Sequence, residues 1–325
     1  MKYFSLVVAQ LILFYFASQA IAQGVLHPNL AINPSLGWSW SRAELFGIDE
    51  NKTKLFLHFK TQKKTAQPSV LIGHDNAGIS ENEITYAEFL YSRGFNVFIT
   101  DRITSRKRAA RPLEKFLISD TFASIEYIKT KFSPQIDSSR LSYVSFSGDG
   151  GFGGLMAIEP KARSIFNSAM PDNFKLRKVV AFYPHCLHMK GRNTDTPTLI
   201  IAAELDGSDP VVCQKAYSNF PIVRVEILKG AYHGFDQSGL KSKTWISKPV
   251  TMPGKCEWTI DLDIPREQQG LHYFMLFTPS GISQNSPEFS AYNRTCTEAV
   301  SGYFSEYRED ITRATFQMSV EFLEN

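Results

Sequence analysis

Short apolar runs alternate with helix-like stretches from about residue 69 to residue 235, and this alternation constrains the fold most. The runs are rich in β-branched and aromatic residues, as buried strands are. Strands are expected at 53–60 (an edge strand), 70–72, 96–100, 141–146, 179–183, 198–202 and 223–228. Helices are expected at 83–93, 114–131 and 297–323. Such a chain folds into an α/β protein, with a mostly parallel central sheet and helices on both faces.

The N-terminus has the pattern of a cleaved secretion signal. Lys2 gives a positive start, residues 3–16 are almost wholly apolar, and Ala20-Ile21-Ala22 offers small residues to a signal peptidase. We therefore assign residues 1–22 to a signal peptide and 23–325 to the mature domain, with a retained membrane anchor as the alternative. The protein is expected to be exported, either periplasmic or secreted, with no stable membrane span after cleavage.

A glycine-rich stretch follows the strand expected at 141–146 and reads Ser-Phe-Ser-Gly-Asp-Gly-Gly-Phe-Gly-Gly from Ser145. A nucleophile on a tight strand-to-helix turn needs small residues two positions before and after it. Ser147 meets this condition on one side only, because Asp149 follows it. Asp149 meets it on both sides, but the strand length favours Ser147. Three readings stay open: Ser147 as nucleophile, Asp149 as nucleophile, or a turn without a nucleophile.

Two further residues follow strands in the order that a hydrolytic triad on a parallel sheet would need. Asp206 comes directly after the strand at 198–202, and His233 comes after the strand at 223–228. A hydroxyl becomes a good nucleophile when an imidazole takes its proton, and a carboxylate fixes the tautomer of that imidazole. The order nucleophile, acid, histidine is the one that the α/β-hydrolase fold uses.

Loops after two other strands supply candidate binding residues. The stretch from His74 to Gly78 can aim a backbone N–H at a developing oxyanion, and the second donor would be Gly148, directly after Ser147. Asp75 is a candidate for orienting the substrate or the nucleophile, unless it only caps its own turn. Basic residues crowd the loop after Asp101; either Arg102 or Arg106 binds a substrate carboxylate there, or the cluster is a solvated surface.

The mature chain keeps four cysteines, and an even number in an exported protein favours two disulfides. Cys186 and Cys213 both follow core strands and flank the Asp206 loop. We therefore expect a Cys186–Cys213 bond, which leaves Cys256–Cys296, with free buried thiols as the alternative. No Cys-x-x-Cys motif or tight Cys/His cluster is present, so no metal site is predicted. The net charge of only +3 gives no reason to expect nucleic acid as a partner.

These motifs resemble the dienelactone hydrolase family of α/β-hydrolases. The resemblance covers roughly residues 68–236 and the final helix, and it is most specific at 180–186, 197–206 and 230–236. It implies an α/β-hydrolase fold with Asp206 and His233 as acid and base, and Asn76 as an oxyanion donor. The elbow departs from the family pattern, since Ser145 and Asp149 stand where the family has glycine. Segment 240–292 has no family counterpart and is read as an insertion before the last helix, either lid-like or surface decoration.

The sequence therefore predicts an exported serine hydrolase that cleaves a small-molecule ester or lactone through an acyl-enzyme on Ser147. It predicts no metal and no organic cofactor. One alternative keeps the fold and uses Asp149 as the nucleophile, as dehalogenases and epoxide hydrolases do. The other is a catalytically inactive binding protein that retains the pocket of a hydrolase.

Overall fold

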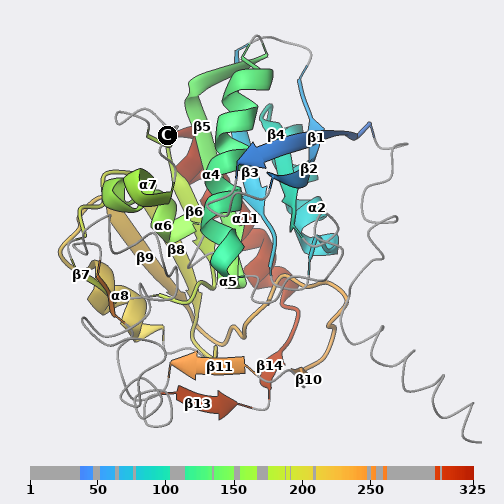
Figure 1. The fold of residues 1–325 in the computed structure, drawn as a ribbon. Coiled ribbons are helices and arrows are strands. Elements are labelled where there is room, and N and C mark those ends of the chain that lie inside the picture. The colour runs from blue at the N-terminus through green and yellow to red at the C-terminus, as the bar shows by residue number, and fades with distance from the viewer. Residues whose placement is uncertain are drawn as a thin grey trace, which may run out of the picture.

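The computed structural model contains one large sheet with helices on both sides (Figure 1). The residues that the structure describes are 37–46, 52–62, 66–75, 78–102, 114–133, 135–149, 154–166, 175–186, 188–190, 192–207, 210–246, 250–253, 259–261, 297–300 and 302–325. The signal peptide expected at 1–22 lies outside them, as do the loop residue Arg106 and most of the predicted insertion 240–292.

Among the residues described, eight strands form the central sheet, in the order β1-β2-β4-β3-β5-β6-β8-β9. Their bounds are β1 Ser39–Phe46, β2 Lys52–Lys60, β3 Gln67–Gly73, β4 Asn96–Asp101, β5 Ile136–Phe146, β6 Val179–Phe182, β8 Thr198–Ala203 and β9 Val223–Leu228. From β4 to β9 all neighbours are parallel, whereas β2 is antiparallel to both β1 and β4. The predicted mostly parallel sheet is therefore confirmed.

Helices cover both faces of this sheet and complete two separate apolar cores. One core lies between the sheet and α4 (Glu114–Lys131), α6 (Leu155–Ala157), α7 (Pro160–Phe166) and α8 (Val211–Tyr217). The other lies between the sheet and two helices, α2 (Glu81–Ser92) and α11 (Glu309–Glu324). The parallel strands β3, β4, β6 and β8 are almost wholly buried, because they are covered from both sides. This double burial explains why they read as unbroken apolar runs.

Two sequence expectations about the sheet and its flanking helices are wrong. The strand at 53–60 is not an edge strand, because β1 pairs along its whole length. β1 was missed because polar and charged residues alternate irregularly in Ser39–Phe46, which gives no apolar run. The helix expected at 297–323 begins only at Glu309, since the residues before it form β13 (Thr297–Val300) and β14 (Tyr303–Ser305). Tertiary pairing overrides helical periodicity there.

Small two-stranded ribbons complete the described structure. β10 (Thr244–Ile246) pairs with β14, and β11 (Val250–Pro253) pairs with β13. β12 (Thr259–Asp261) pairs with β7 (His188–Lys190), in parallel. In Figure 1, β10, β11, β13 and β14 lie beyond the end of the sheet at which β5 runs into the short helix α5 (Ser147–Asp149). Part of the inserted segment therefore lies at the carboxyl ends of the parallel strands, where ligands bind in such folds.

Candidate active site

Ser147 stands on a strained turn at the centre of the sheet. It follows the last residue of β5 directly and has a φ of 55°, in the left-handed region that residues other than glycine rarely adopt. Space around the turn is tight, because a Cβ added to Gly154 would lie 2.4 Å from the Ser145 side-chain oxygen. A side chain at position 154 would therefore collide with Ser145. The sequence predicted crowding of this kind two residues from the nucleophile, whereas the structure places it between Ser145 and Gly154.

Ser147, His233 and Asp206 form one hydrogen-bonded chain. The Ser147 Oγ lies 2.8 Å from Nε2 of His233, and Nδ1 of His233 lies 2.7 Å from Oδ2 of Asp206. With Asp206 ionised, Nδ1 carries the proton and donates a hydrogen bond to the carboxylate. Nε2 then carries no proton and accepts a hydrogen bond from the serine hydroxyl. Each residue comes from the end of a different parallel strand, as predicted. The structure thus brings together three of the residues that the sequence singled out.

Burial and the neighbouring acids act in opposite directions on the pKa of His233. Burial is the largest single influence and lowers the pKa of His233, but the Asp206 carboxylate opposes it through charge and hydrogen bonding. Asp75 and Asp236 add further negative charge, and the net pKa of His233 is raised above its usual 6.5. A raised pKa makes the imidazole a stronger base, which suits a group that must take a proton from a hydroxyl.

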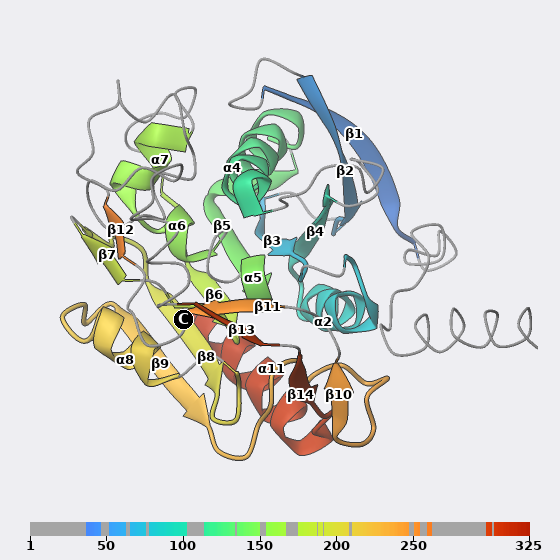
Figure 2. The same ribbon diagram turned by 60° about the horizontal axis from the view of Figure 1, so that its bottom comes forward.

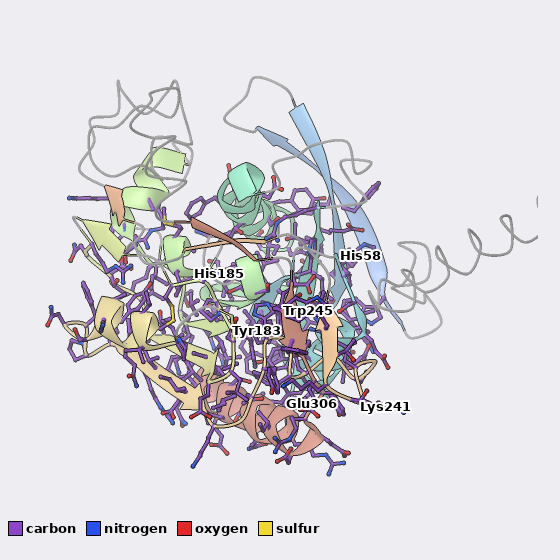
Figure 3. All side chains as sticks on the ribbon, turned by 90° about the horizontal axis from the view of Figure 1, so that it is seen from below. His58, Tyr183, His185, Lys241, Trp245 and Glu306 are labelled. Atoms are coloured by element: carbon purple, nitrogen blue, oxygen red, sulfur yellow. A yellow bond between two sulfur atoms is a disulfide. The ribbon has the colours of Figure 1, made fainter. Side chains whose placement is uncertain are left out.

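Aromatic rings pack around the imidazole of His233. The ring of Tyr183 meets it edge-on at 4.7 Å between centroids, and the ring of Tyr303, on β14, does so at 5.1 Å. The ring of His185 lies 6.3 Å away. Figure 3 looks onto this end of the molecule and shows Tyr183 and His185 near its middle. Such packing limits the rotation of the imidazole and keeps its two nitrogens directed at Ser147 and Asp206.

The loop that carries His233 is fixed by the chain directly before and within α11. The Ser305 hydroxyl donates to the backbone carbonyl of His233 at 2.7 Å. The backbone N–H of Arg308 and the hydroxyl of Thr312 both donate to the carbonyl of Phe235, at 2.8 and 3.1 Å. The C-terminal part of the chain thus positions the catalytic candidate, a role that sequence reasoning did not assign to it.

A cluster of buried acids lies next to His233, and sequence reasoning missed two of its members. The Tyr183 hydroxyl donates to Asp236 at 2.7 Å, and burial raises the pKa of Asp236 to about 6. Burial, together with the charge of Asp75, raises the pKa of Glu83 to about 8. Tyr183 and Asp236 stand within the family-like stretches 180–186 and 230–236, and both follow strand ends. These positions could have identified them as site residues from the sequence. Glu83 on α2 gave no such signal.

The other predicted site residues have different surroundings. Gly148 follows Ser147 directly in α5, which is the place in the chain at which the sequence predicts an oxyanion donor. Asp75 is buried; its N–H donates to Glu83, and its carboxylate accepts from Gln237 at 3.4 Å. Asn76 and Arg106 lie outside the described residues, and so does the side chain of Asp149.

Arg102 belongs to the interior instead of an exposed binding loop. Its side chain is 1% exposed, and Nη2 donates to the hydroxyls of Thr121 and Tyr143 at 3.3 and 3.2 Å. Its backbone N–H donates to Nε2 of His74, so that ring is a neutral acceptor; burial and the Arg102 charge lower the pKa of His74 to about 4. Arg102 therefore contacts His74, in the loop after β3, through its backbone, and its burial corrects the prediction that it binds a substrate carboxylate.

The predicted disulfide between Cys186 and Cys213 is confirmed. It joins the segment after β6 to α8 and closes a loop that contains Asp206. Cys256 and Cys296, the other predicted pair, lie outside the described residues. Within the described ranges, no group of three or more His, Cys, Asp or Glu side chains could hold a metal ion, and no helix is long and apolar enough to cross a membrane.

No protein-family model matches the sequence, and neither does any curated protein at a significant level. Solved structures do resemble the fold. Esterase 2 of Thermogutta terrifontis, phosphorylated by paraoxon, matches with a TM-score of 0.50 at 12% identity, over 65% of this chain and 88% of that chain.

Two proteins from metagenomic libraries match less well. The dienelactone hydrolase-like promiscuous phosphotriesterase P91 has a TM-score of 0.46 at 14% identity, over 61% of this chain and 84% of its own. The α/β-hydrolase MGS-M1, from a Medee basin deep-sea library, has a TM-score of 0.41 at 16% identity, with the same coverage of 61% and 84%. At such identities a structural match establishes the fold alone. With its parallel sheet and covered faces, the chain has the α/β-hydrolase fold.

Proposed function

We propose that the protein is an exported serine hydrolase that cleaves an ester or lactone of a small molecule. The observation that carries this proposal is the chain of hydrogen bonds from Ser147 through His233 to Asp206, on the strand ends where this fold places chemistry. Ser147 is preferred to Asp149 because its hydroxyl lies within hydrogen-bond distance of Nε2 of His233. The strained φ of Ser147 supports the same choice, since strain of this kind concentrates at functional sites.

The geometry supports the following reaction. Nε2 of His233 takes the proton of Ser147 as Oγ attacks the carbonyl carbon, and Asp206 stabilises the imidazolium that forms. The N–H of Gly148 binds the oxyanion of the tetrahedral intermediate, with Asn76 as the expected second donor. His233 then protonates the leaving alkoxide, which departs as an alcohol. Water, activated by the same imidazole, hydrolyses the acyl-serine and releases the carboxylic acid.

Export rests on the N-terminal sequence pattern, and the buried Cys186–Cys213 bond is compatible with it. Disulfides persist in oxidising compartments, which are the destinations of chains with such a signal. Processing before Gln23 is the expected outcome. N-terminal sequencing of the protein recovered outside the cytoplasm would test this, and a chain that keeps residues 1–22 would contradict it.

A fluorophosphonate probe tests the nucleophile. Such probes react with an activated serine, and the Thermogutta esterase of the same fold is itself phosphorylated by an organophosphate, paraoxon. We expect peptide mapping to find the adduct on Ser147 and expect Ser147→Ala and His233→Ala to abolish labelling. The matched control is Ser145→Ala, because Ser145 is also buried beside the turn but donates to a backbone carbonyl. It should still be labelled.

Three results would overturn the proposal. Labelling that persists in Ser147→Ala would place the reactive serine elsewhere. Absence of any serine adduct, together with an alkyl ester formed on Asp149 from a haloalkane, would assign the chemistry to the aspartate. A folded protein that binds esters without hydrolysing any of a broad panel of esters and lactones would support the non-catalytic alternative.

A further inference from the structure

Strand β9 forms the end of the sheet opposite β1, and β8 is the only strand that pairs with it in the described part of the chain. Figure 2 shows β9 at this outer position, away from β1 and β2. An edge strand presents backbone N–H and C=O groups that can pair with another chain, and proteins commonly protect such edges with proline, lysine or a covering loop. The sequence of β9, Val-Arg-Val-Glu-Ile-Leu, contains no proline and no lysine.

The backbone groups that face the open edge can be assigned. The carbonyls of Ile222 and Leu228 accept from N–H groups on the β8 side, at 3.1 Å in both cases. Because backbone groups alternate along a strand, the groups of Val223, Val225 and Ile227 point away from β8. The N–H of Val223 already donates to Phe220. The N–H groups of Val225 and Ile227 and the carbonyls of all three residues therefore face outward.

The outward groups and the side chains of β9 are complementary to a second copy of the same strand. If two β9 strands pair antiparallel about Val225, the N–H of Ile227 meets the carbonyl of Val223 in the other copy, and the Val225 groups pair with each other. The Val223 N–H is engaged in its own turn, so it does not donate to the Ile227 carbonyl, and one hydrogen bond joins each Val223–Ile227 pair. Opposite side chains on one face are then β-branched, which is a favourable cross-strand combination.

Charge selects this register. On the other face of the strand, Arg224 and Glu226 contact each other at 2.6 Å, and their side chains are 57% and 35% exposed. Pairing about Val225 sets Arg224 of each copy opposite Glu226 of the other. The neighbouring registers with the same backbone pattern are centred on Arg224 or on Glu226, and they set like charges directly opposite each other, which is destabilising.

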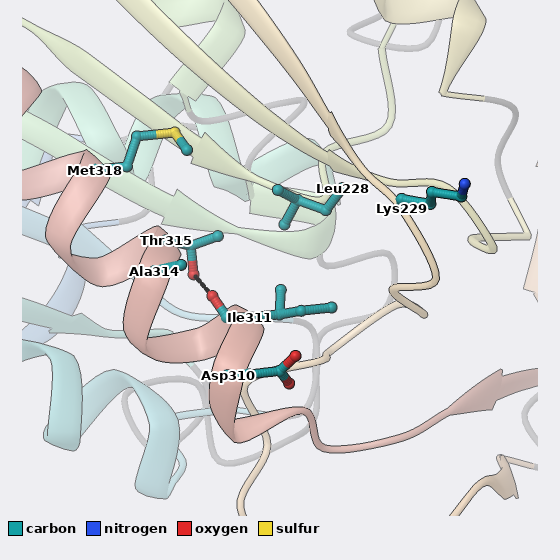
Figure 4. A pocket seen from close by; sticks show the side chains of 7 residues that line it. All are labelled: Leu228, Lys229, Asp310, Ile311, Ala314, Thr315 and Met318. Carbon is teal, nitrogen blue, oxygen red and sulfur yellow. Dashed lines mark hydrogen bonds between the residues drawn. The ribbon is translucent and has the colours of Figure 1, made fainter.

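The groove beside β9 fits the same arrangement. It lies between the end of β9 and α11 and is lined on its apolar side by Leu228, Ile311, Ala314 and Met318 (Figure 4). Pairing about Val225 places Ile222 of the second copy opposite Leu228, on the same face as the groove. An exposed apolar groove next to an open strand thus gains an apolar side chain from the same partner.

We propose that the protein forms a two-fold symmetric dimer in which the β9 strands of two copies pair antiparallel about Val225 and extend the sheet across both subunits. A two-fold interface uses the same patch on both copies, which is why a self-complementary strand is required. This proposal is independent of the hydrolase activity, because Ser147, Asp206 and His233 contribute nothing to the pairing.

Charge reversal tests the register directly. Sedimentation velocity of the chain without residues 1–22 should show a dimer at micromolar concentration. Arg224→Glu sets acid opposite acid, and Glu226→Arg sets base opposite base. The dissociation constant of the dimer should therefore rise about tenfold or more in each variant alone. An equimolar mixture of the two variants should form a dimer again, because each acid of the first variant then faces a base of the second in both cross-strand contacts.

This mixing experiment also controls for folding, since a misfolded variant could not restore association. A wild-type protein that is monomeric throughout this range would mean that the charges on β9 protect its edge, and the proposal would fail. It would fail equally if either single variant dimerised like the wild type, or if the mixture stayed monomeric. In both of those cases any dimer would use another surface.

Discussion

Removing the Cys186–Cys213 bond should destabilise the protein strongly while leaving its chemistry nearly intact. The bond spans 27 residues of sequence. In the loop-closure model, a loop of that length restricts the unfolded chain by about 12 cal/mol/K, which corresponds to about 3.5 kcal/mol at 25 °C. The double variant Cys186→Ala/Cys213→Ala should therefore lose about that much free energy of unfolding, measured by urea denaturation.

Activity should respond much less, although Asp206 lies inside the loop that the bond closes. The acid loop is also tied to the histidine loop by its own backbone. The N–H of Leu205 donates to the carbonyl of Ala231 at 2.8 Å, and the Glu204 side chain accepts from the N–H of Gly230 at 2.7 Å. These contacts hold Asp206 beside His233 without the disulfide, so kcat for an ester substrate should change less than about tenfold.

The two single variants provide the control. Either Cys186→Ala or Cys213→Ala already breaks the bond, so each should cost nearly as much as the double variant, and their effects should not add. A double variant that loses less than about 1 kcal/mol would refute the loop-closure argument. Additive single effects would show that packing of the two buried side chains, and not their covalent link, is what stabilises the fold.

Three further predictions concern the site. The kcat/KM for an ester should fall on the acidic side of the pH profile as His233 is protonated, with a midpoint above pH 6.5. Asp206→Asn should lower the rate by about 10³–10⁴-fold and move this midpoint to lower pH. A midpoint that does not move would contradict the assignment of Asp206. Tyr183→Phe leaves a buried carboxylate without one donor and should cost about 1–3 kcal/mol in urea denaturation, whereas a loss under about 0.5 kcal/mol would exclude that contact as stabilising. Because the pKa of Glu83 is raised to about 8 in the folded state, its contribution to stability is present below about pH 4.5 and is lost as pH rises toward 8. Between pH 5 and 7.5 the wild type should lose on the order of 3 kcal/mol of unfolding free energy relative to Glu83→Gln. The exposed control Glu81→Gln should show the same dependence of unfolding free energy on pH as the wild type.

Local sequence was sufficient wherever one stretch of chain carries its own signal. The parallel strands β3, β4, β6 and β8 are buried on both faces, so their apolar runs could be recognised without any partner. Asp206 follows the buried strand β8, and His233 follows the edge strand β9; because the carboxyl ends of parallel strands lie at one edge of the sheet, their order along the chain predicted that they would meet. Ser147 was predicted in the same way, but its neighbours could not exclude Asp149.

Tertiary structure decided what depends on residues far apart in sequence. β14 reads as part of a helix until it pairs with β10, some sixty residues earlier. Arg102 reads as a surface cation until the fold buries it against Thr121 and Tyr143. The choice of Ser147 depends on a distance to His233 across 86 residues of chain. The sequence by itself determined the parallel strands and the order of Ser147, Asp206 and His233 along the chain, because strand patterns are local; strand β1, the contact of Ser147 with His233 and the buried acids around the imidazole required three-dimensional proximity, which no local pattern contains.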